Sequence, residues 1–420
     1  MDNKALIVGN GFSINFDRSF ANIYGALNKG KNNLLKLGEF DISLGAKPNT
    51  KQALKTNYSR VLNFVRNMNQ SKLEKIFIDA LEFAEFITIT PEISGMLLDS
   101  KYIHKLKTAP NMVEITERIA KIGKEKGIHY VNIENWPVLF WIYNLVDRTP
   151  EFIEFNKSPN LFITLMKLGE TVVLFDPNTP GSVMPRTRSN GFAIFYRLLM
   201  ISIVFNEGKS VDIDKLENIN YINKEVLKTW LNDHRLLFSL NYDLILETVS
   251  QREILHLHGK FSEIKEGDIF YYSFALSNNK KKYYTNDILL GDYTTTKVVD
   301  GFIHELVMNK QAFAKQMKDP CKILEENLKS ESINHIVFFG VHPENDYHIL
   351  SNIYYYFYSN NIISPKITYF FYDEDAKETF NSTWEHIIEK IYSKTLNYAQ
   401  SIEINYLDSK DLLKDKFFIV

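Results

Sequence analysis

Short runs of consecutive apolar residues recur in two parts of the chain, and they predict buried β-strands. The first run covers residues 5–8, and later runs cover residues 236–240, 254–257, 335–339 and 366–372. Amphipathic helical spacing follows the first run and the last two. Near-continuous apolar strands that alternate with amphipathic helices are typical of a parallel sheet covered on both faces. The pattern therefore predicts an α/β fold.

The helix after the first strand is predicted from apolar residues at three- and four-residue spacing. These residues are Phe16, Phe20, Ile23, Tyr24 and Leu27. Together with the strand, they indicate a strand-turn-helix unit at the start of the chain.

Residues 41–234 show helical periodicity almost throughout. Their longest apolar stretch, Phe192–Phe205, contains Arg197 and is shorter than the roughly 20 residues that cross a bilayer. A buried helix is therefore expected there. We predict that residues 1–40 and 235–420 form a Rossmann-like nucleotide-binding domain and that 41–234 form a large, mainly helical insertion.

Composition narrows the classes of function. The 420 residues include 49 Lys and Arg and 51 Asp and Glu, a net charge of −2, so no global field favours nucleic acid or an anionic membrane. Cys321 is the single cysteine, which excludes an intramolecular disulfide framework and a zinc site built from several cysteines. Residues 1–10 hold an apolar run too short for a signal peptide. We expect a soluble, cytoplasmic protein that binds neither specific nucleic acid sequences nor membranes.

Polar or glycine-rich segments follow the predicted strands, where parallel sheets bind ligands. The first segment is Gly9, Asn10, Gly11, Phe12 and Ser13. Its backbone N–H groups can approach a diphosphate, with a helix dipole behind them. The third glycine of the dinucleotide fingerprint is absent, and the segment has no lysine of a P-loop. A tight turn with no ligand is an equally good interpretation.

The next two strands end in residues that carry chemistry. Asn241 and Asp243 can both face a crevice, although an Asx turn that caps the following helix is the commoner role of such residues. His256 and His258 lie on one face of a strand, but no further ligands stand at a recognisable metal spacing. We expect no metal. His258, followed by Gly259, is the better candidate for a base, and we expect His256 to be packed or hydrogen-bonded within the sheet.

A fourth segment runs from Gly340 to His348 after the strand at 335–339. It combines a glycine at the strand end with polar residues that lead into a helix. Asp346 is a candidate ligand contact, and the alternative role is a helix N-cap.

In this order, the four segments resemble the sirtuin-like NAD-consuming fold, in the branch found among NAD glycohydrolases of bacterial anti-phage defence. That family has a GxGxS turn after its first strand, a strand that ends in N-x-D, a strand that ends in H-G and a late G…D loop. The matching segments here are residues 9–13, 241–243, 258–259 and 340–346.

The resemblance implies hydrolysis of NAD, as the substrate, to nicotinamide and ADP-ribose. Residues 9–13 would hold the diphosphate, and Gly340 and Asp346 would border the adenosine. Asn241 would orient water or the ribose, Asp243 would lie near the carboxamide and His258 would act as base. The family also implies a homo-oligomer, and in some members a partner ATPase or a phage-derived trigger.

Two departures from the family bear on this expectation. Protein-deacylating sirtuins carry a four-cysteine zinc module, which a chain with one cysteine lacks. Leu240 and His342 stand where those enzymes usually have Gln and Ser. The sequence thus favours a gated NAD glycohydrolase over a deacylase. The alternative is a non-catalytic subunit that binds NAD or ADP-ribose and signals its presence.

Overall fold

The structure is a computed structural model, and it describes residues 2–17, 22–35, 40–44, 48–99, 112–168, 191–205, 216–263, 274–278, 283–286, 320–391 and 395–419. The chain divides into two compact units. The α/β unit comprises Met1–Ala21, Glu207–Phe261 and Lys315–Val420. The helical unit comprises Asn22–Asn206 and Ser262–Ala314.

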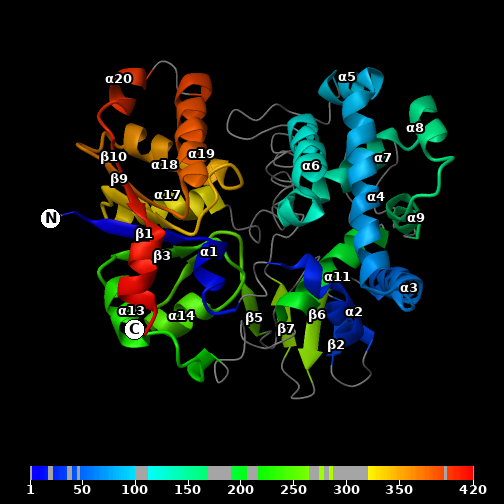
Figure 1. The fold of residues 1–420 in the computed structure, drawn as a ribbon, viewed down its shortest axis with the longest axis horizontal. Helices are drawn as coiled ribbons and strands as arrows, with labels where there is room; N and C mark the ends of the chain where they lie inside the picture. The colour runs from blue at the N-terminus through cyan, green and yellow to red at the C-terminus, as the bar shows by residue number, and fades with distance from the viewer. Residues whose placement is uncertain are drawn as a thin grey trace. The chain divides into compact units, whose positions relative to one another are not determined.

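A six-stranded, all-parallel sheet forms the centre of the α/β unit (Figure 1). Its order is β10-β9-β8-β1-β3-β4. Numbered along the chain and read from the β4 edge, the order is 3-2-1-4-5-6, which is that of doubly wound nucleotide-binding folds. The strands are β1 (Lys4–Val8), β3 (Leu236–Ser239), β4 (Leu255–His256), β8 (His335–Phe339), β9 (Lys366–Phe371) and β10 (Glu403–Asp408). The predicted α/β class is confirmed, and the topology is compatible with a Rossmann-like fold.

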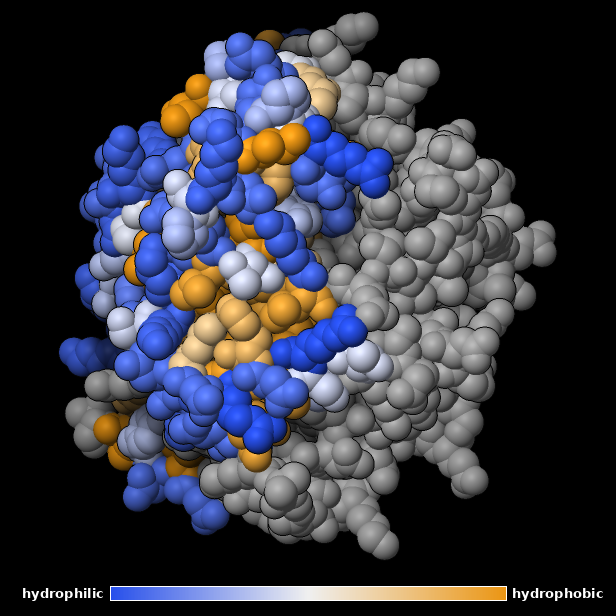
Figure 2. Space-filling model, turned by 90° about the vertical axis from the view of Figure 1, so that its right-hand side faces the viewer, coloured by the Kyte–Doolittle hydropathy of each residue, from blue (hydrophilic) through white to orange (hydrophobic). Residues whose placement is uncertain are grey.

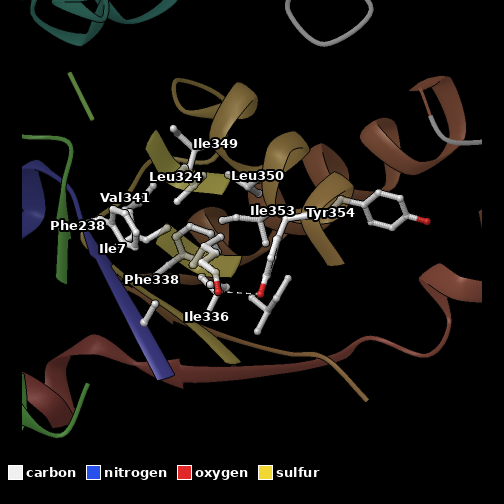
Figure 3. Close-up of a cluster of buried hydrophobic side chains, with 14 of the residues drawn as sticks. Ile7, Phe238, Leu324, Ile336, Phe338, Val341, Ile349, Leu350, Ile353 and Tyr354 are labelled. Carbon is white, nitrogen blue, oxygen red and sulfur yellow. Dashed lines mark hydrogen bonds between the residues drawn. The ribbon is translucent and has the colours of Figure 1, made fainter. Parts of the chain in front are cut away.

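Both faces of this sheet are buried, which explains its near-continuous apolar strands. Ala5 and Ile7 belong to one core cluster, and Leu6 and Val8 belong to another on the opposite face. In the first cluster, strand residues such as Ile7 and Phe338 pack against helical residues such as Ile353 (Figure 3).

Helices cover each face of the sheet (Figure 1). The first core cluster contains residues of α17 (Pro320–Ser330), α18 (Tyr347–Ser359) and α19 (Glu374–His386). The second contains residues of α13 (Lys224–Asn232), α14 (Ile245–Ser250) and α21 (Ser409–Leu412). The short helix α20 (Leu396–Ala399) precedes β10.

The helix predicted from the spacing of Phe16 to Leu27 is wrong as a single element, because Phe16 lies in a turn, Tyr24 begins a short 3₁₀ helix and Leu27 begins α2 (Leu27–Leu35). Phe20 lies outside the described residues. Helix α1 spans only Asn10–Ser13. The Asn15 side chain donates to the carbonyl oxygens of Gly11, at 2.7 Å, and Phe12, at 3.2 Å. A side chain that occupies these carbonyls competes with the next helical turn. Tyr24 lies in the helical unit.

The helical unit contains α2 (Leu27–Leu35), α3 (Pro48–Val65), α4 (Gln70–Ile89), α5 (Pro91–Asp99), α6 (Met112–Lys126), α7 (Pro137–Val146), α8 (Pro150–Phe155), α9 (Leu161–Met166) and α11 (Gly191–Phe205). Helix α11 is the apolar stretch predicted as a buried helix, and Phe192, Ala193 and Ile194 on it are fully buried. A second sheet has the order β2-β6-β7-β5, with antiparallel pairs β2–β6 and β6–β7. Its strands are β2 (Phe40–Leu44), β5 (Phe261–Glu263), β6 (Phe274–Asn278) and β7 (Tyr283–Asn286).

The unit boundaries differ from those expected at residues 40 and 235. Residues 22–40 cluster with the helical unit, and residues 207–234 cluster with the α/β unit. Residues 207–234 join the α/β unit because Leu227 and Leu231 of α13 are fully buried against the parallel sheet. Residues 262–314 also cluster with the helical unit.

Apolar side chains gather on the face of the molecule that Figure 2 shows, with hydrophilic side chains around them. Exposed apolar residues of the helical unit include Ile89 at 77% and Ile153 at 56%. Within the part of the chain that the structure describes, no helix is both long and apolar enough to span a membrane.

The buried side chain of His234 makes the stability of the α/β unit dependent on pH. Its Nδ1 lies 3.1 Å from the carbonyl oxygen of Trp230 at the end of α13. Burial lowers the pKa of His234 from 6.5 to about 4, although hydrogen bonds to Leu231 and Trp230 partly oppose this. The unfolded chain therefore takes up a proton at a higher pH than the folded chain does.

We expect the free energy of unfolding to fall as the pH decreases from 6.5 towards 4. A His234→Gln variant lacks this contribution, so the difference in stability between the two proteins should change across that range. Urea unfolding at several pH values measures it. Parallel pH profiles for the two proteins would contradict the assignment.

Candidate functional site

The residues singled out in the sequence follow the strands β1, β3, β4 and β8, which are neighbours in the sheet. Because the sheet is parallel, these strands end at the same edge. The chain order reverses between β1 and β8, and such a switch point is where doubly wound sheets bind ligands. The structure therefore places the loops after β1 and β8 on the two sides of the expected crevice.

Three glycines bring these two loops into direct contact. The N–H of Gly11 donates to the carbonyl oxygen of Gly340 at 3.0 Å, and that of Gly9 donates to Phe339 at 3.0 Å. A Cβ on Gly11 would lie 2.6 Å from the Gly340 Cα. Gly340 also has a φ of +68°, a conformation that side chains disfavour. Contact between the loops thus explains why these positions are glycine.

The other residues of the first loop have different environments. The Phe12 side chain is fully buried in the core, with its ring 5.6 Å from that of Phe417, and its N–H donates to Gly9. Asn10 is exposed at the first position of α1. The N–H groups of Gly9, Gly11 and Phe12 all donate within the protein, so in this conformation they are not available to a diphosphate.

Ser13, Asn241 and Asp243 form one hydrogen-bonded network, although more than 200 residues separate the first from the others. Asn241 Nδ2 donates to the carbonyl oxygen of Gly9 at 2.9 Å and to Ser13 Oγ at 2.8 Å. Ser13 Oγ donates to Asp243 Oδ2 at 2.6 Å. Both hydrogens of the Asn241 amide are therefore used within the protein, and its Oδ1 is the atom that can accept a hydrogen bond from a ligand.

Asp243 forms the Asx turn that the sequence left open, just before the N-cap residue of α14. Its Oδ1 accepts from the N–H of Ile245 at 3.0 Å, at the start of α14. Burial raises the pKa of Asp243, and hydrogen bonds from Ser13 and Ile245 partly oppose that rise. With one carboxylate oxygen bonded to Ser13 and the other to Ile245, the residue anchors the network.

His258 faces a second histidine that the sequence did not single out. Its Nε2 lies 3.4 Å from Nε2 of His348, and the ring centroids are 5.5 Å apart. The side chains are buried, with exposed fractions of 1% for His258 and 5% for His348. His348 belongs to α18, so this contact joins the loop after β4 to the helix after β8. The sequence placed His348 at the end of the fourth polar segment but predicted no role for it, because it lies on a mainly apolar helix.

His256 is hydrogen-bonded at the sheet edge, as the sequence led us to expect. Its Nδ1 lies 2.8 Å from the carbonyl oxygen of Asn241, and its Nε2 lies 2.7 Å from Oε1 of Glu247. Lys260 Nζ lies 3.2 Å from the same carboxylate oxygen. Burial acts to raise the pKa of Glu247, but the hydrogen bond and charge of His256 outweigh it, and the net pKa is lowered.

Asp346 occupies the N-cap position of α18, two residues before His348. Its carbonyl oxygen accepts from the N–H of Ile349 at 2.8 Å. The side chain is 8% exposed and makes no capping hydrogen bond.

The site offers an oriented amide oxygen, a carboxylate network and a pair of facing imidazoles, all buried at one sheet edge. Such groups can position a substrate and accept a proton. Among the described residues, no group of three or more His, Cys, Asp or Glu side chains could hold a metal ion.

Comparisons with protein-family models, curated proteins and solved structures found no match to this chain.

Proposed function

We propose that this protein is an NAD glycohydrolase, which cleaves NAD to nicotinamide and ADP-ribose. The observation that carries the proposal is the network of Ser13, Asn241 and Asp243 at the switch point of a doubly wound parallel sheet. The same residues matched the sirtuin-like motifs in the sequence. The finer assignment of the fold as sirtuin-like is part of the proposal.

The chemistry asks little of the protein beyond positioning and electrostatic stabilisation. Nicotinamide leaves NAD as a neutral molecule from a cationic group, so the N-glycosidic bond breaks through an oxocarbenium-like state. In the proposal, Asn241 Oδ1 accepts a hydrogen bond from the attacking water or a ribose hydroxyl. Asp243 fixes Ser13, and Ser13 in turn fixes the Asn241 amide. No metal ion takes part.

The loop of residues 9–13 does not bind the diphosphate through its backbone in this proposal, in contrast to the expectation from the sequence. Its N–H groups at Gly9, Gly11 and Phe12 already have acceptors, so the glycines hold the two loops together rather than donate to the diphosphate. Asn10 is exposed beside them and is a candidate contact for the substrate. Gly340 and Asp346 border the adenosine side.

His258 is the proposed base, and its burial supports a gated enzyme. Its Nε2 faces His348 and only 1% of the residue is exposed. A substrate would reach this nitrogen only after the loop after β4 and helix α18 move apart. An enzyme that consumes its own cell's NAD needs such a restraint. Assembly into a homo-oligomer, a partner ATPase or a phage-derived trigger would release it, in a role of anti-phage defence.

Nicotinamide release by the purified full chain tests this proposal. The protein is incubated with NAD, alone and with added partner protein or phage material, and nicotinamide and ADP-ribose are separated by chromatography. We expect both products from the wild type and about 100-fold less from His258→Ala, because a general base contributes at least that much. His386→Ala, at an exposed histidine of α19, is the matched control.

Each outcome of this assay is informative. No release of nicotinamide under any of the conditions would contradict the enzymatic proposal. Equal release by the wild type and His258→Ala would contradict the role of His258 but not the activity.

A non-catalytic subunit that binds NAD or ADP-ribose is the second candidate function. The internal hydrogen bonds of Asn241 and Asp243 and the burial of His258 favour it, because these groups are committed to the protein itself. Calorimetric binding of ADP-ribose without any release of nicotinamide from NAD would favour this subunit over the enzyme.

A further inference from the structure

The loop that carries Asn241 lies beyond the regular part of the sheet. Strand β3 ends at Ser239, and β4 pairs with it only through Phe238–Leu255 and Ser239–His256. Residues 240–244 then lead into α14 without strand pairing. The Leu240 N–H still donates to Val8, but the hydrogen bonds to the Asn241 backbone itself come from side chains, with Ser239 Oγ accepting from its N–H at 3.1 Å.

His256 provides one of these bonds from the neighbouring strand. A backbone carbonyl can only accept, so the Nδ1 at 2.8 Å from the Asn241 oxygen carries a hydrogen. Glu247 contacts the other ring nitrogen at 2.7 Å, which fixes the orientation of the ring. The His256 side chain is 4% exposed and that of Glu247 19%, so water competes little for these contacts.

The charged residues around the His256 imidazole include both acidic and basic side chains, and they come from different elements. Glu247 lies on α14, and Lys260, in the segment after β4, contacts the same carboxylate oxygen at 3.2 Å. Asp243 is a second acidic neighbour, since the charge of His256 acts to lower its pKa. A carboxylate that contacts one ring nitrogen fixes the tautomer and the orientation of the ring, and so fixes the direction in which the other nitrogen points.

We propose that His256 and Glu247 are positioning residues for Asn241. His256 holds the backbone of Asn241, while Gly9 and Ser13 hold its side-chain amide. Fixed at both ends, Asn241 presents Oδ1 in one direction. This role in the reaction rests on the proposed NAD glycohydrolase activity, whereas the control of the loop by His256 does not.

Two substitutions at His256 separate its two nitrogens. The amide nitrogen of asparagine can replace Nδ1 and still reach the Asn241 carbonyl. The amide nitrogen of glutamine instead replaces Nε2 and reaches Glu247. We expect His256→Asn to keep nicotinamide release within about threefold of the wild type, and His256→Gln to lower kcat about 30-fold through misplacement of Asn241.

Hydrogen exchange of the full chain, followed by mass spectrometry, gives a second readout that needs no activity. The amides of Leu240, Asn241 and Ile245 donate to Val8, Ser239 Oγ and Asp243 Oδ1. We expect faster exchange of peptides over residues 240–245 in His256→Gln than in His256→Asn. Glu247→Gln should lie between them, because it keeps an acceptor for the ring but loses the charge.

His234→Gln is the matched control for a buried histidine bonded to backbone carbonyls. His234 lies just before the start of β3, whereas Asn241 follows the end of that strand. The substitution should therefore change neither kcat nor the hydrogen exchange over residues 240–245. Equal exchange over 240–245 in His256→Asn and His256→Gln would overturn the proposal, as would equal kcat in an active protein. A wild type without activity would contradict the proposed function alone, and the exchange result would still decide the role of His256.

Discussion

Replacement of Gly340 by alanine is expected to destabilise the α/β unit by about 3 kcal/mol or more. The φ of +68° alone costs an L-residue roughly 1–2 kcal/mol. The added Cβ would also lie 2.6 Å from the Gly11 Cα and 2.7 Å from the Phe12 nitrogen. These are backbone atoms of α1, so relief requires a shift of the backbone, and overpacking of this kind costs about 1–3 kcal/mol more.

Two glycines of the helical unit separate these contributions. Gly127 has a φ of +92° and a ψ of 168°, a backbone region that is essentially restricted to glycine, but open space where a Cβ would lie, so Gly127→Ala should cost only the backbone strain, about 1–3 kcal/mol. Gly95 in helix α5 has neither constraint, and Gly95→Ala should stabilise its helix by about 0.5–1 kcal/mol. Chemical denaturation, with hydrogen exchange to assign each transition to a unit, measures all three. A cost for Gly340→Ala no larger than that for Gly127→Ala would contradict the close contact of the loops.

This contact changes what the glycine motif signifies. The sequence allowed either a diphosphate-binding turn or a tight turn without a ligand. In the structure, Gly9, Gly11 and Gly340 are all needed for the two loops to touch. Glycines with such spacing after a strand are therefore not by themselves a sign of a bound nucleotide. Ser13 is the residue of this loop that takes part in the candidate site, because its hydroxyl accepts a hydrogen bond from the Asn241 amide.

The strands of the parallel sheet could be predicted because both of their faces are buried. Residues 335–339 form β8, and residues 5–8 lie within β1. Strand β10 (Glu403–Asp408) was missed, because its residues alternate between exposed and half-buried at the edge of the sheet and form no apolar run. The unit boundaries also escaped prediction, because α13 has the same helical periodicity as the helices of the other unit.

The candidate site was predictable where its residues follow strands. Asn241, Asp243 and Ser13 converge because parallel strands end at one edge, which the sequence pattern already implied. Glu247 and His348 lie within helices, where a single polar residue looks like any other. What distinguishes them is contact with another candidate residue: Glu247 contacts His256, and His348 contacts His258. These contacts arise from the packing of α14 and α18, which the sequence pattern does not give.

Removal of the Asn241 side chain is expected to have the largest effect on activity. Asn241→Ala deletes the oriented Oδ1, and loss of a single oriented polar group that acts in the transition state lowers kcat by about 100- to 1,000-fold. The KM for NAD should change little, since in the proposed reaction the amide acts at the reacting ribose and not on the rest of the substrate. Nicotinamide release under activating conditions measures both parameters.

Ser13→Ala provides a graded comparison with Asn241→Ala. It keeps Oδ1 but removes one of the two acceptors that orient the Asn241 amide, with Gly9 as the other. The loss in kcat should therefore be smaller, about tenfold, which corresponds to roughly one neutral hydrogen bond. Asn405→Ala on β10, where the amide donates to Glu403 Oε1 at 2.8 Å, is the control and should retain full activity. If Asn241→Ala folds and retains activity within a factor of about two, too small for an oriented polar group, then Asn241 serves the loop structure alone and the reaction must depend on other residues of this sheet edge.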